Sequence, residues 1–173
     1  EQVIAAAAMI RTVHPALLTI LAPRHAERGA GLGQAPRRAL GALPDAGPLY
    51  IADTMGELGL LYRVASLAFI GGSLVPHGGH NPLEAMAFGC PITSGPHVHN
   101  FAALYADLDR RGGVQWLPAL PTGPAPAASA GTALGTAFAG LLSDSAARAR
   151  IGRASGEAFA AGAGAAGRSA QAL

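Results

Sequence analysis

The sequence GGSLVPHGGHNPLE at residues 71–84 decides how the chain around it can fold, and it follows a short apolar run, LAFI, at 67–70. Four glycines and two prolines in this stretch prevent a continuous helix or strand, so the apolar run must end in a sharp turn. Asn81 can cap a following helix, Pro82 suits its first position, and Glu84 falls in its first turn. We therefore predict a strand, a glycine-rich turn and a helix.

Such a turn exposes backbone N–H groups at the carboxyl edge of a strand, where open α/β sheets bind phosphorylated ligands. Composition alone is equally compatible with a tight connection that binds nothing. A Walker phosphate loop requires a lysine, and all 12 cationic residues of the chain are arginines. The glycines at 71, 72, 78 and 79 also lack the Gly-x-Gly-x-x-Gly spacing of the dinucleotide fingerprint. The turn therefore carries neither motif.

Length, charge and cysteine content limit the classes of protein to which the chain can belong. A chain of 173 residues suffices for one well-buried α/β domain. The net charge is only +2 and no arginine cluster alternates with aromatic residues, so we expect no nucleic-acid partner. The single cysteine, Cys90, lies in an apolar run and is interpreted as a buried packing residue in a reducing compartment.

No apolar stretch reaches the roughly 18 residues of a membrane span, and the first residues show no signal-peptide pattern. We therefore expect this chain by itself to be soluble. Its first residues, EQVIAAAAMI, begin within a helical pattern without a cap. We take this as an indication that the chain is a piece of a longer protein.

Apolar runs of strand length recur along the chain, and each is followed by a turn and a helical pattern. The alternation predicts an α/β fold, a Rossmann-like parallel sheet with flanking helices. The expected strands are 17–22, 48–53, 67–70, 90–93 and 114–117. The expected helices are 1–13, 34–43, one capped by Thr54, one from Asn81 to Gly89, one capped by Asn100, 131–142, and 145–161 capped by Ser143 or Ser145. We expect residues 1–117 to form the sheet domain, 118–130 a Pro/Ala-rich loop, and 131–173 helices that pack on the same domain.

Two further loops at the expected sheet edge carry candidate site residues. Arg24 follows Pro23 after the first strand, and its guanidinium is suited to a phosphate or carboxylate, although a solvated loop arginine is an equally ordinary interpretation. Met55 could pack on a flat base and Gly56 could let a ligand approach the backbone. Glu57 lies three residues after Thr54, so a capping box alone would explain it.

Four histidines, His77, His80, His97 and His99, lie in two loops at the same expected edge. A zinc site would need ligands at suitable spacing, and no cysteine or acidic residue accompanies them. We therefore expect no metal, and interpret the histidines as polar lining of an anion site.

Four blocks of sequence resemble one known family. The blocks are PRHAER at 23–28, DTMGELGLLYRVASLAFIGGSL at 53–74, GGHNPLEA at 78–85 and GPHVHNF at 95–101. In order and spacing they resemble the carboxy-terminal domain of bacterial 3-deoxy-D-manno-octulosonic acid (Kdo) transferases, over roughly residues 1–117. The resemblance implies the carboxy-terminal half of a GT-B glycosyltransferase, in which two Rossmann-like halves face each other and this half binds the donor CMP-Kdo. It also implies a lipid A precursor as acceptor at the cytoplasmic face of the inner membrane, in lipopolysaccharide biosynthesis, with no cofactor.

The resemblance assigns donor contacts to matching positions of this chain. Glu84 would accept hydrogen bonds from the ribose, Arg24 and the helix that begins at Asn81 would hold the phosphate, and the Met55 loop would read the cytosine. The implied donor-binding residues are Pro23, Arg24, Met55, Gly56, Glu57, Asn81, Pro82, Leu83 and Glu84, with Gly72, Ser73 and His80 in the surrounding loop.

The chain also departs from the family. Position 26 is Ala where the family usually has Pro, and 88–90 is a variant segment. The family's general base is a glutamate of the amino-terminal domain, which also carries the acceptor site and the membrane anchor, so we expect no catalytic residue here. The chain alone is then expected to bind the donor nucleotide weakly and not to turn over. A GT-B domain for another nucleotide sugar, and a non-catalytic binding module or remnant, stay open as alternatives.

Overall fold

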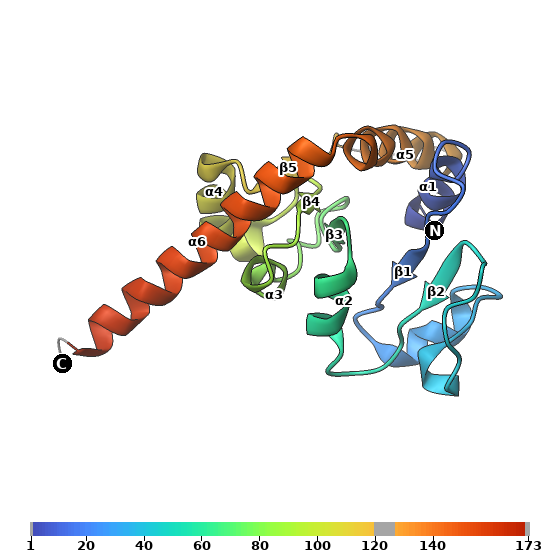
Figure 1. The fold of residues 1–173 in the computed structure, drawn as a ribbon, viewed down its shortest axis with the longest axis horizontal. Coiled ribbons are helices and arrows are strands. Elements are labelled where there is room, and N and C mark those ends of the chain that lie inside the picture. Colours follow the sequence, from blue (N-terminus) through green and yellow to red (C-terminus); the bar gives the residue numbers. More distant parts are fainter. Residues whose placement is uncertain (1, 120–126, 172–173) are drawn as a thin grey trace. The chain divides into compact units, whose positions relative to one another are not determined.

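The computed structural model describes residues 2–119 and 127–171, and side chains for 2–119 and 131–163. The chain divides into two compact units. The first unit comprises Glu1–Leu58 with Pro124–Ala139, and the second unit comprises Gly59–Gly123 with Gly140–Leu173. Figure 1 labels the helices and strands of both units.

The first unit is built on a pair of parallel strands. Strand β1 (Thr19–Leu21) pairs with β2 (Leu49–Ile51), with Ile20 opposite Tyr50. Helix α1 (Gln2–Ile10) precedes the strands, and the first part of α5 (Ala127–Ser143) packs against it. A Cβ at Gly135 would lie under 3.0 Å from the Met9 sulfur, so the two helices are in close contact because position 135 has no side chain. Two 3₁₀ helices, η1 (Ala26–Gly31) and η2 (Arg38–Leu40), connect β1 to β2.

The second unit is built on three parallel strands in the order β3-β4-β5. Ala68 of β3 lies opposite Ile92 of β4, which lies opposite Val114 of β5. Helices connect the strands, and the long α6 packs against α3 and α4 (Figure 1). The bounds are α2 (Leu58–Val64), β3 (Ala68–Ile70), α3 (Leu83–Ala87), β4 (Ile92–Ser94), the 3₁₀ helix η3 (His99–Phe101), α4 (Ala102–Arg111), β5 (Val114–Trp116) and α6 (Ser145–Gln171).

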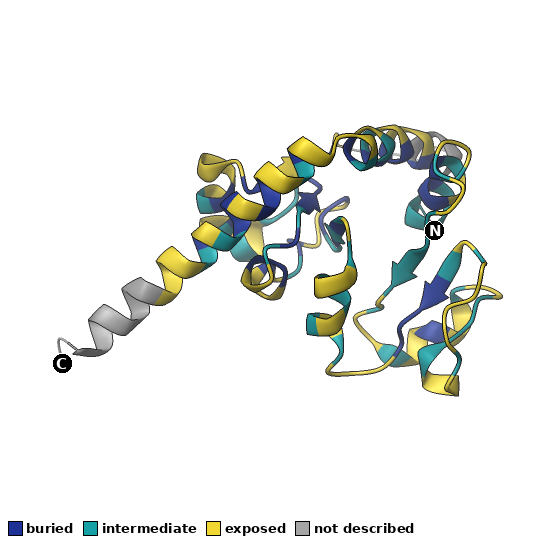
Figure 2. Cartoon of the chain, viewed as in Figure 1, coloured by how far each residue is buried: buried dark blue, intermediate teal, exposed yellow. Residues whose placement is uncertain are grey.

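The core of the second unit surrounds its central strand. All three residues of β4 are buried, as expected for a parallel strand covered on both faces, and Figure 2 shows this burial in dark blue. Leu108 of α4 and Ile92 of β4 are fully buried there. Cys90 belongs to the same core, and burial raises the pKa of its thiol to about 11, so the interpretation as a packing residue is confirmed.

Two glycines end helices of the second unit in the same way. Gly89 after α3 and Gly112 after α4 both have a left-handed backbone, with φ of 59° and 72°. After α3, Gly89 donates its N–H to the Met86 carbonyl and Cys90 donates to the Ala85 carbonyl, which is the Schellman pattern. The predicted helix end at Gly89 is thus confirmed.

The parallel α/β fold with flanking helices is confirmed, but several sequence predictions are wrong in detail. The strands form two sheets where one was predicted. The predicted helix 34–43 is reduced to η2, because the left-handed Gly41 ends it after one turn. The predicted helix 1–13 is shorter than expected: α1 ends at Ile10, and Val13 is 60% exposed. The predicted loop 118–130 lies largely outside the described residues, and its last residues belong to α5.

Three predicted helix caps are also wrong. Helix α2 begins at Leu58, and Thr54 contacts the Glu57 side chain instead of capping a helix. Asn100 lies inside η3, and its amide donates to the His77 carbonyl. Helix α6 is capped by Asp144, whose carboxylate accepts the Ala147 N–H at 2.8 Å, and it continues to Gln171. Within the described residues, none of the helices has both the length and the apolar character to span a membrane.

A test of the second unit's core is Leu108→Ala. Leu108 is fully buried between α4 and the sheet, so its truncation should lower the free energy of unfolding by about 2–5 kcal/mol. The matched control is Leu60→Ala, because Leu60 is 56% exposed on α2 and should change stability by no more than about 0.5 kcal/mol. Urea unfolding followed by circular dichroism measures both, and equal losses would contradict the placement of the core.

Candidate functional site

The residues predicted from the sequence to form a site fall in both units. Pro23, Arg24, Met55, Gly56 and Glu57 belong to the first unit. The second unit contains the others, which are Gly72, Ser73, His80, Asn81, Pro82, Leu83 and Glu84.

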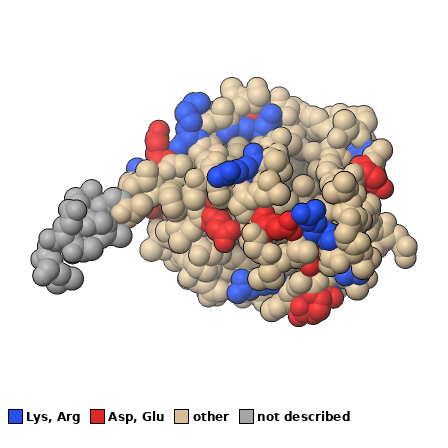
Figure 3. Space-filling model, turned by 60° about the horizontal axis from the view of Figure 1, so that its bottom comes forward, with Lys and Arg blue, Asp and Glu red and all other residues tan. Residues whose placement is uncertain are grey.

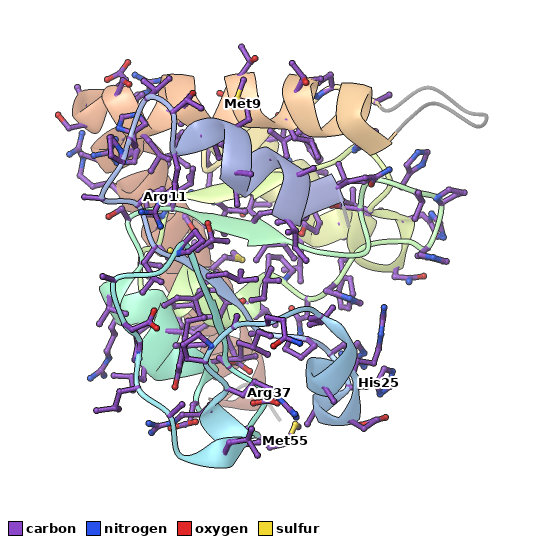
Figure 4. All side chains as sticks on the ribbon, turned by 90° about the vertical axis from the view of Figure 1, so that its right-hand side faces the viewer. Met9, Arg11, His25, Arg37 and Met55 are labelled. Carbon is purple, nitrogen blue, oxygen red and sulfur yellow. The ribbon has the colours of Figure 1, made fainter. Side chains whose placement is uncertain are left out.

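In the first unit, the candidate residues follow the two parallel strands. Because β1 and β2 run in the same direction, the loop with Arg24 and the loop with Met55 leave the same edge of the pair, as predicted. Figure 4 shows His25, which follows Arg24, and Met55 at the same end of this view. Arg24 is exposed and makes no hydrogen bond or ion pair with a described residue, and Met55 is 81% exposed. Both side chains are therefore available to a ligand.

A buried carboxylate that the sequence did not single out supports these loops. Asp53, two residues after β2, is 3% exposed and accepts hydrogen bonds from the Arg37 side chain at 2.7 Å and from the Ala39 N–H at 2.9 Å. The Ala39 hydrogen bond and the Arg37 guanidinium lower the pKa of Asp53, although burial acts against them. A Cβ at Gly29 of η1 would lie under 3.0 Å from the Asp53 carboxylate, so the chain after β1 packs directly on it.

The second carboxylate of this region, Glu57, is held by Arg38. Arg38 donates to Glu57 Oε1 through its terminal nitrogen at 2.6 Å, and its Nε lies 3.1 Å from both carboxylate oxygens. The Thr54 hydroxyl donates to Glu57 Oε2. The Arg38 hydrogen bond, followed by that of Thr54, lowers the pKa of Glu57 to about 2. Between these residues, Gly56 has a φ of 83°, a conformation that favours glycine.

In the second unit, the glycine-rich loop closes on itself after β3. Gly79 donates its N–H to the Gly72 carbonyl at 2.9 Å, and His80 donates to the Gly71 carbonyl at 3.0 Å. Gly72 has a positive φ, and the His80 ring lies against it, so that an added Cβ would be 3.2 Å from the ring. The Tyr105 hydroxyl donates to the His80 carbonyl at 3.3 Å. The glycines thus form a fixed turn.

Ser73 joins this loop to the loop after β4. Its side chain is fully buried, and the hydroxyl donates to the Ile70 carbonyl at 2.7 Å and accepts the Gly95 N–H at 2.9 Å. The Ser73 carbonyl accepts the His97 N–H at 3.0 Å. A Cβ at Gly95 would lie under 3.0 Å from the Ser73 backbone. Ser73 therefore supports the loops from inside, and it does not offer its hydroxyl to a ligand.

The start of α3 carries the remaining candidates of the second unit. The Asn81 side-chain oxygen accepts the Leu83 N–H at 3.0 Å, and Pro82 is buried. Helix α3 begins at Leu83 with Pro82 at its cap position, so the predicted start, with Asn81 as cap and Pro82 as first helical residue, is one residue too early. Glu84 is exposed and makes no hydrogen bond with a described residue. Burial and then the charge of Glu84 raise the pKa of Tyr62. Glu84 is therefore a carboxylate near an aromatic side chain with its oxygens unoccupied.

The histidines after β4 line a shallow groove of about 320 Å³. His97, His99 and Trp116 of β5 line it, and the Trp116 indole N–H donates to Asp109 at 2.6 Å. The described residues contain no group of three or more His, Cys, Asp or Glu that could hold a metal ion. Arginines and acidic side chains are interspersed on the face drawn in Figure 3, in keeping with the small net charge.

Comparison with known proteins confirms the resemblance drawn from the four sequence blocks. No protein-family model matches the chain. The 3-deoxy-D-manno-octulosonic acid transferase of Haemophilus influenzae is 42% identical over 104 residues, and that of Bordetella pertussis is 39% identical over 103 residues. These matches cover 55% and 53% of this chain, and the chain spans about a quarter, 24%, of the length of each relative.

The fold is also similar to a solved structure. The crystal structure of the C-terminal CMP-Kdo binding domain of WaaA from Acinetobacter baumannii matches with a TM-score of 0.76 and 26% sequence identity. The match covers 91% of this chain and 81% of that one. The chain is therefore similar in sequence, over about half its length, to 3-deoxy-D-manno-octulosonic acid transferases, and in fold, over most of its length, to a C-terminal CMP-Kdo binding domain.

Ser73→Ala tests the connection between the loops after β3 and β4. The variant leaves the buried Gly95 N–H without its acceptor, which should cost about 1–3 kcal/mol of unfolding free energy. Ser66→Ala is the matched control, since Ser66 is exposed in the same unit. The two variants would be compared by chemical unfolding, and a Ser73→Ala variant as stable as the control would show that the bridge does not hold the loops.

The lowered pKa of Glu57 predicts that the stability of the folded chain depends on pH. Its pKa in the folded chain is about 2, below the ordinary value of 4.5, so its ion pair stabilises the fold above pH 4.5 and loses this effect as the pH falls towards about 2. Urea midpoints over this pH interval should fall less steeply for Glu57→Gln than for the unchanged chain. Glu157→Gln, at an exposed position of α6, should keep the original slope. Parallel slopes for all three proteins would contradict the ion pair.

Proposed function

We propose that this chain is the donor-binding half of a Kdo transferase, a GT-B glycosyltransferase that transfers Kdo from CMP-Kdo to a lipid A precursor. The observation that carries the proposal is the fold match to a domain described as binding CMP-Kdo, over nearly the whole chain. The sequence similarity to named Kdo transferases supports it independently.

In the first unit, we assign the phosphate to Arg24 and the base to the loop of Met55. Arg24 presents a fork of donors that suits phosphate oxygens, and its guanidinium has no partner among the described residues. Met55 offers an exposed, polarisable side chain to the flat cytosine, and Gly56 lets the ring approach the backbone. Pro23 fixes the exit of the chain from β1 before Arg24.

In the second unit, we assign the ribose to Glu84. A carboxylate accepts hydrogen bonds from two neighbouring hydroxyls, and the Glu84 oxygens are exposed and unoccupied by described residues. The turn formed by Asn81, Pro82 and Leu83 holds Glu84 at the start of α3, and the closed loop of Gly72 and His80 directly precedes this turn in the chain.

The proposed reaction is direct transfer of Kdo to an acceptor hydroxyl with departure of CMP. Negative charge develops on the leaving phosphate, so the task of this half is to stabilise that charge, which Arg24 can do. The general base, the acceptor site and the membrane association are assigned to the amino-terminal half of such a protein. We accordingly place the full protein at the cytoplasmic face of the inner membrane, in lipopolysaccharide biosynthesis, and expect turnover only when both halves are present.

The experiment that tests this function is a calorimetric titration of the chain with CMP and, separately, with UMP. CMP should bind at least about tenfold more tightly than UMP, because loss of one well-placed hydrogen bond to the base costs about 1.4 kcal/mol. Glu84→Ala should weaken CMP binding about tenfold or more, since it removes a charged acceptor. Glu157→Ala, which removes an exposed carboxylate from α6, should leave the affinity unchanged.

The other outcomes separate the alternative functions. Equal affinity for CMP and UMP would favour a GT-B domain for another nucleotide sugar. A folded chain that binds neither nucleotide would contradict the proposed donor site and favour a non-catalytic module.

A further inference from the structure

The loop of Thr54, Met55, Gly56 and Glu57 is held at both of its ends by consecutive arginines. Asp53 precedes the loop and binds Arg37, whereas Glu57 ends the loop and binds Arg38. Both ion pairs lie within the first unit, so the whole arrangement belongs to one compact body.

The backbone before η2 explains how two neighbouring arginines reach the loop. Residue 37 forms a parallel bridge with Ile51 at the end of β2, and the Ile51 N–H donates to the Pro36 carbonyl at 2.9 Å. The chain therefore runs beside the end of β2 at residues 36–37, close to the point from which the loop departs. The Ala39 N–H completes the contact by donating to Asp53.

The contacts of Glu57 leave little room for a ligand on its carboxylate. A carboxylate offers about four lone-pair positions. In Glu57, Oε1 accepts from two nitrogens of Arg38, and Oε2 accepts from Arg38 Nε and from the Thr54 hydroxyl. The Glu57 side chain is 29% exposed, whereas Met55 is 81% exposed. The loop thus exposes its methionine and engages its glutamate internally.

We propose that Arg38 and Glu57 are positioning residues: their ion pair, together with that of Arg37 and Asp53, fixes the 54–57 loop so that Met55 and Gly56 receive the nucleotide base. The inference deepens the proposed function and rests on it. It changes the role of Glu57, which the family resemblance alone makes a donor contact, into that of an anchor. Arg38, which no sequence motif singled out, becomes a determinant of base binding.

The test combines CMP titration with hydrogen exchange of the ligand-free chain. In Arg38→Ala, the amides of residues 54–57 should exchange at least about tenfold faster, because one end of the loop is released. The affinity for CMP should fall about fivefold to tenfold, which corresponds to about 1–1.4 kcal/mol of lost preorganisation. Glu57→Gln should produce a similar loss. The double variant should be no weaker than either single variant, since both changes break the same interaction.

Two further variants control the experiment. Arg38→Lys keeps the positive charge but loses the planar, forked arrangement of N–H donors. Its affinity for CMP should therefore lie between those of the unchanged chain and Arg38→Ala. Arg110→Ala removes an exposed arginine that pairs with Asp107 on α4, and it should change neither the exchange of residues 54–57 nor the affinity. A merely general loss of stability would lower the midpoint of thermal unfolding without the selective change in the loop.

The outcomes distinguish the inference from the proposed function. If the unchanged chain does not bind CMP, the proposed function fails, and the exchange measurement alone decides whether Arg38 fixes the loop. If the chain binds CMP and Arg38→Ala binds it equally or more tightly, Glu57 is a direct ligand that Arg38 masks, and the inference is overturned. Unchanged exchange of residues 54–57 in Arg38→Ala would also overturn it.

Discussion

The buried hydroxyl of Ser73 is the interaction on which the loops of the second unit depend. Its two hydrogen bonds join the end of β3 to the first residue after β4, at a place where Gly95 has no space for a side chain. Glycine-rich segments lose much conformational entropy when they are ordered, so they need fixed contacts. The hydroxyl supplies these contacts from inside and leaves the outer surface of both loops to other groups.

The first unit fixes its loops with charge where the second unit uses a neutral hydroxyl. Asp53 and Glu57 each bind an arginine. The pKa of Asp53 is lowered by the Ala39 N–H and then by Arg37, and the pKa of Glu57 is lowered chiefly by Arg38. The Arg37–Asp53 pair is nearly enclosed and should be little affected by salt, whereas the Arg38–Glu57 pair is partly exposed and more easily screened. The Met55 loop is therefore held by a buried ion pair at Asp53 and by a partly exposed ion pair at Glu57.

The sequence predicted the fold better than it predicted the support of the site. Apolar runs and glycines located the five strands and the end of α3, because buried strands require apolar residues and a left-handed backbone favours glycine. Asp53 was missed because its partner, Arg37, lies sixteen residues earlier and is brought close only by the bridge to Ile51. The Glu57 capping box was wrong for a similar reason, since a distant arginine competes for the carboxylate. The division of the strands into two sheets could not be predicted, because the sequence of a three-residue strand does not indicate which strand it pairs with.

The burial of Cys90 gives this chain a practical property. The thiolate is the form that reacts with alkylating reagents, and burial raises the pKa of this thiol to about 11, far above neutral pH. Cys90 is also the single cysteine of the sequence. A second cysteine introduced at an exposed position can therefore carry a fluorophore or spin label by itself, without replacement of the native residue, so that motions of either unit can be followed spectroscopically.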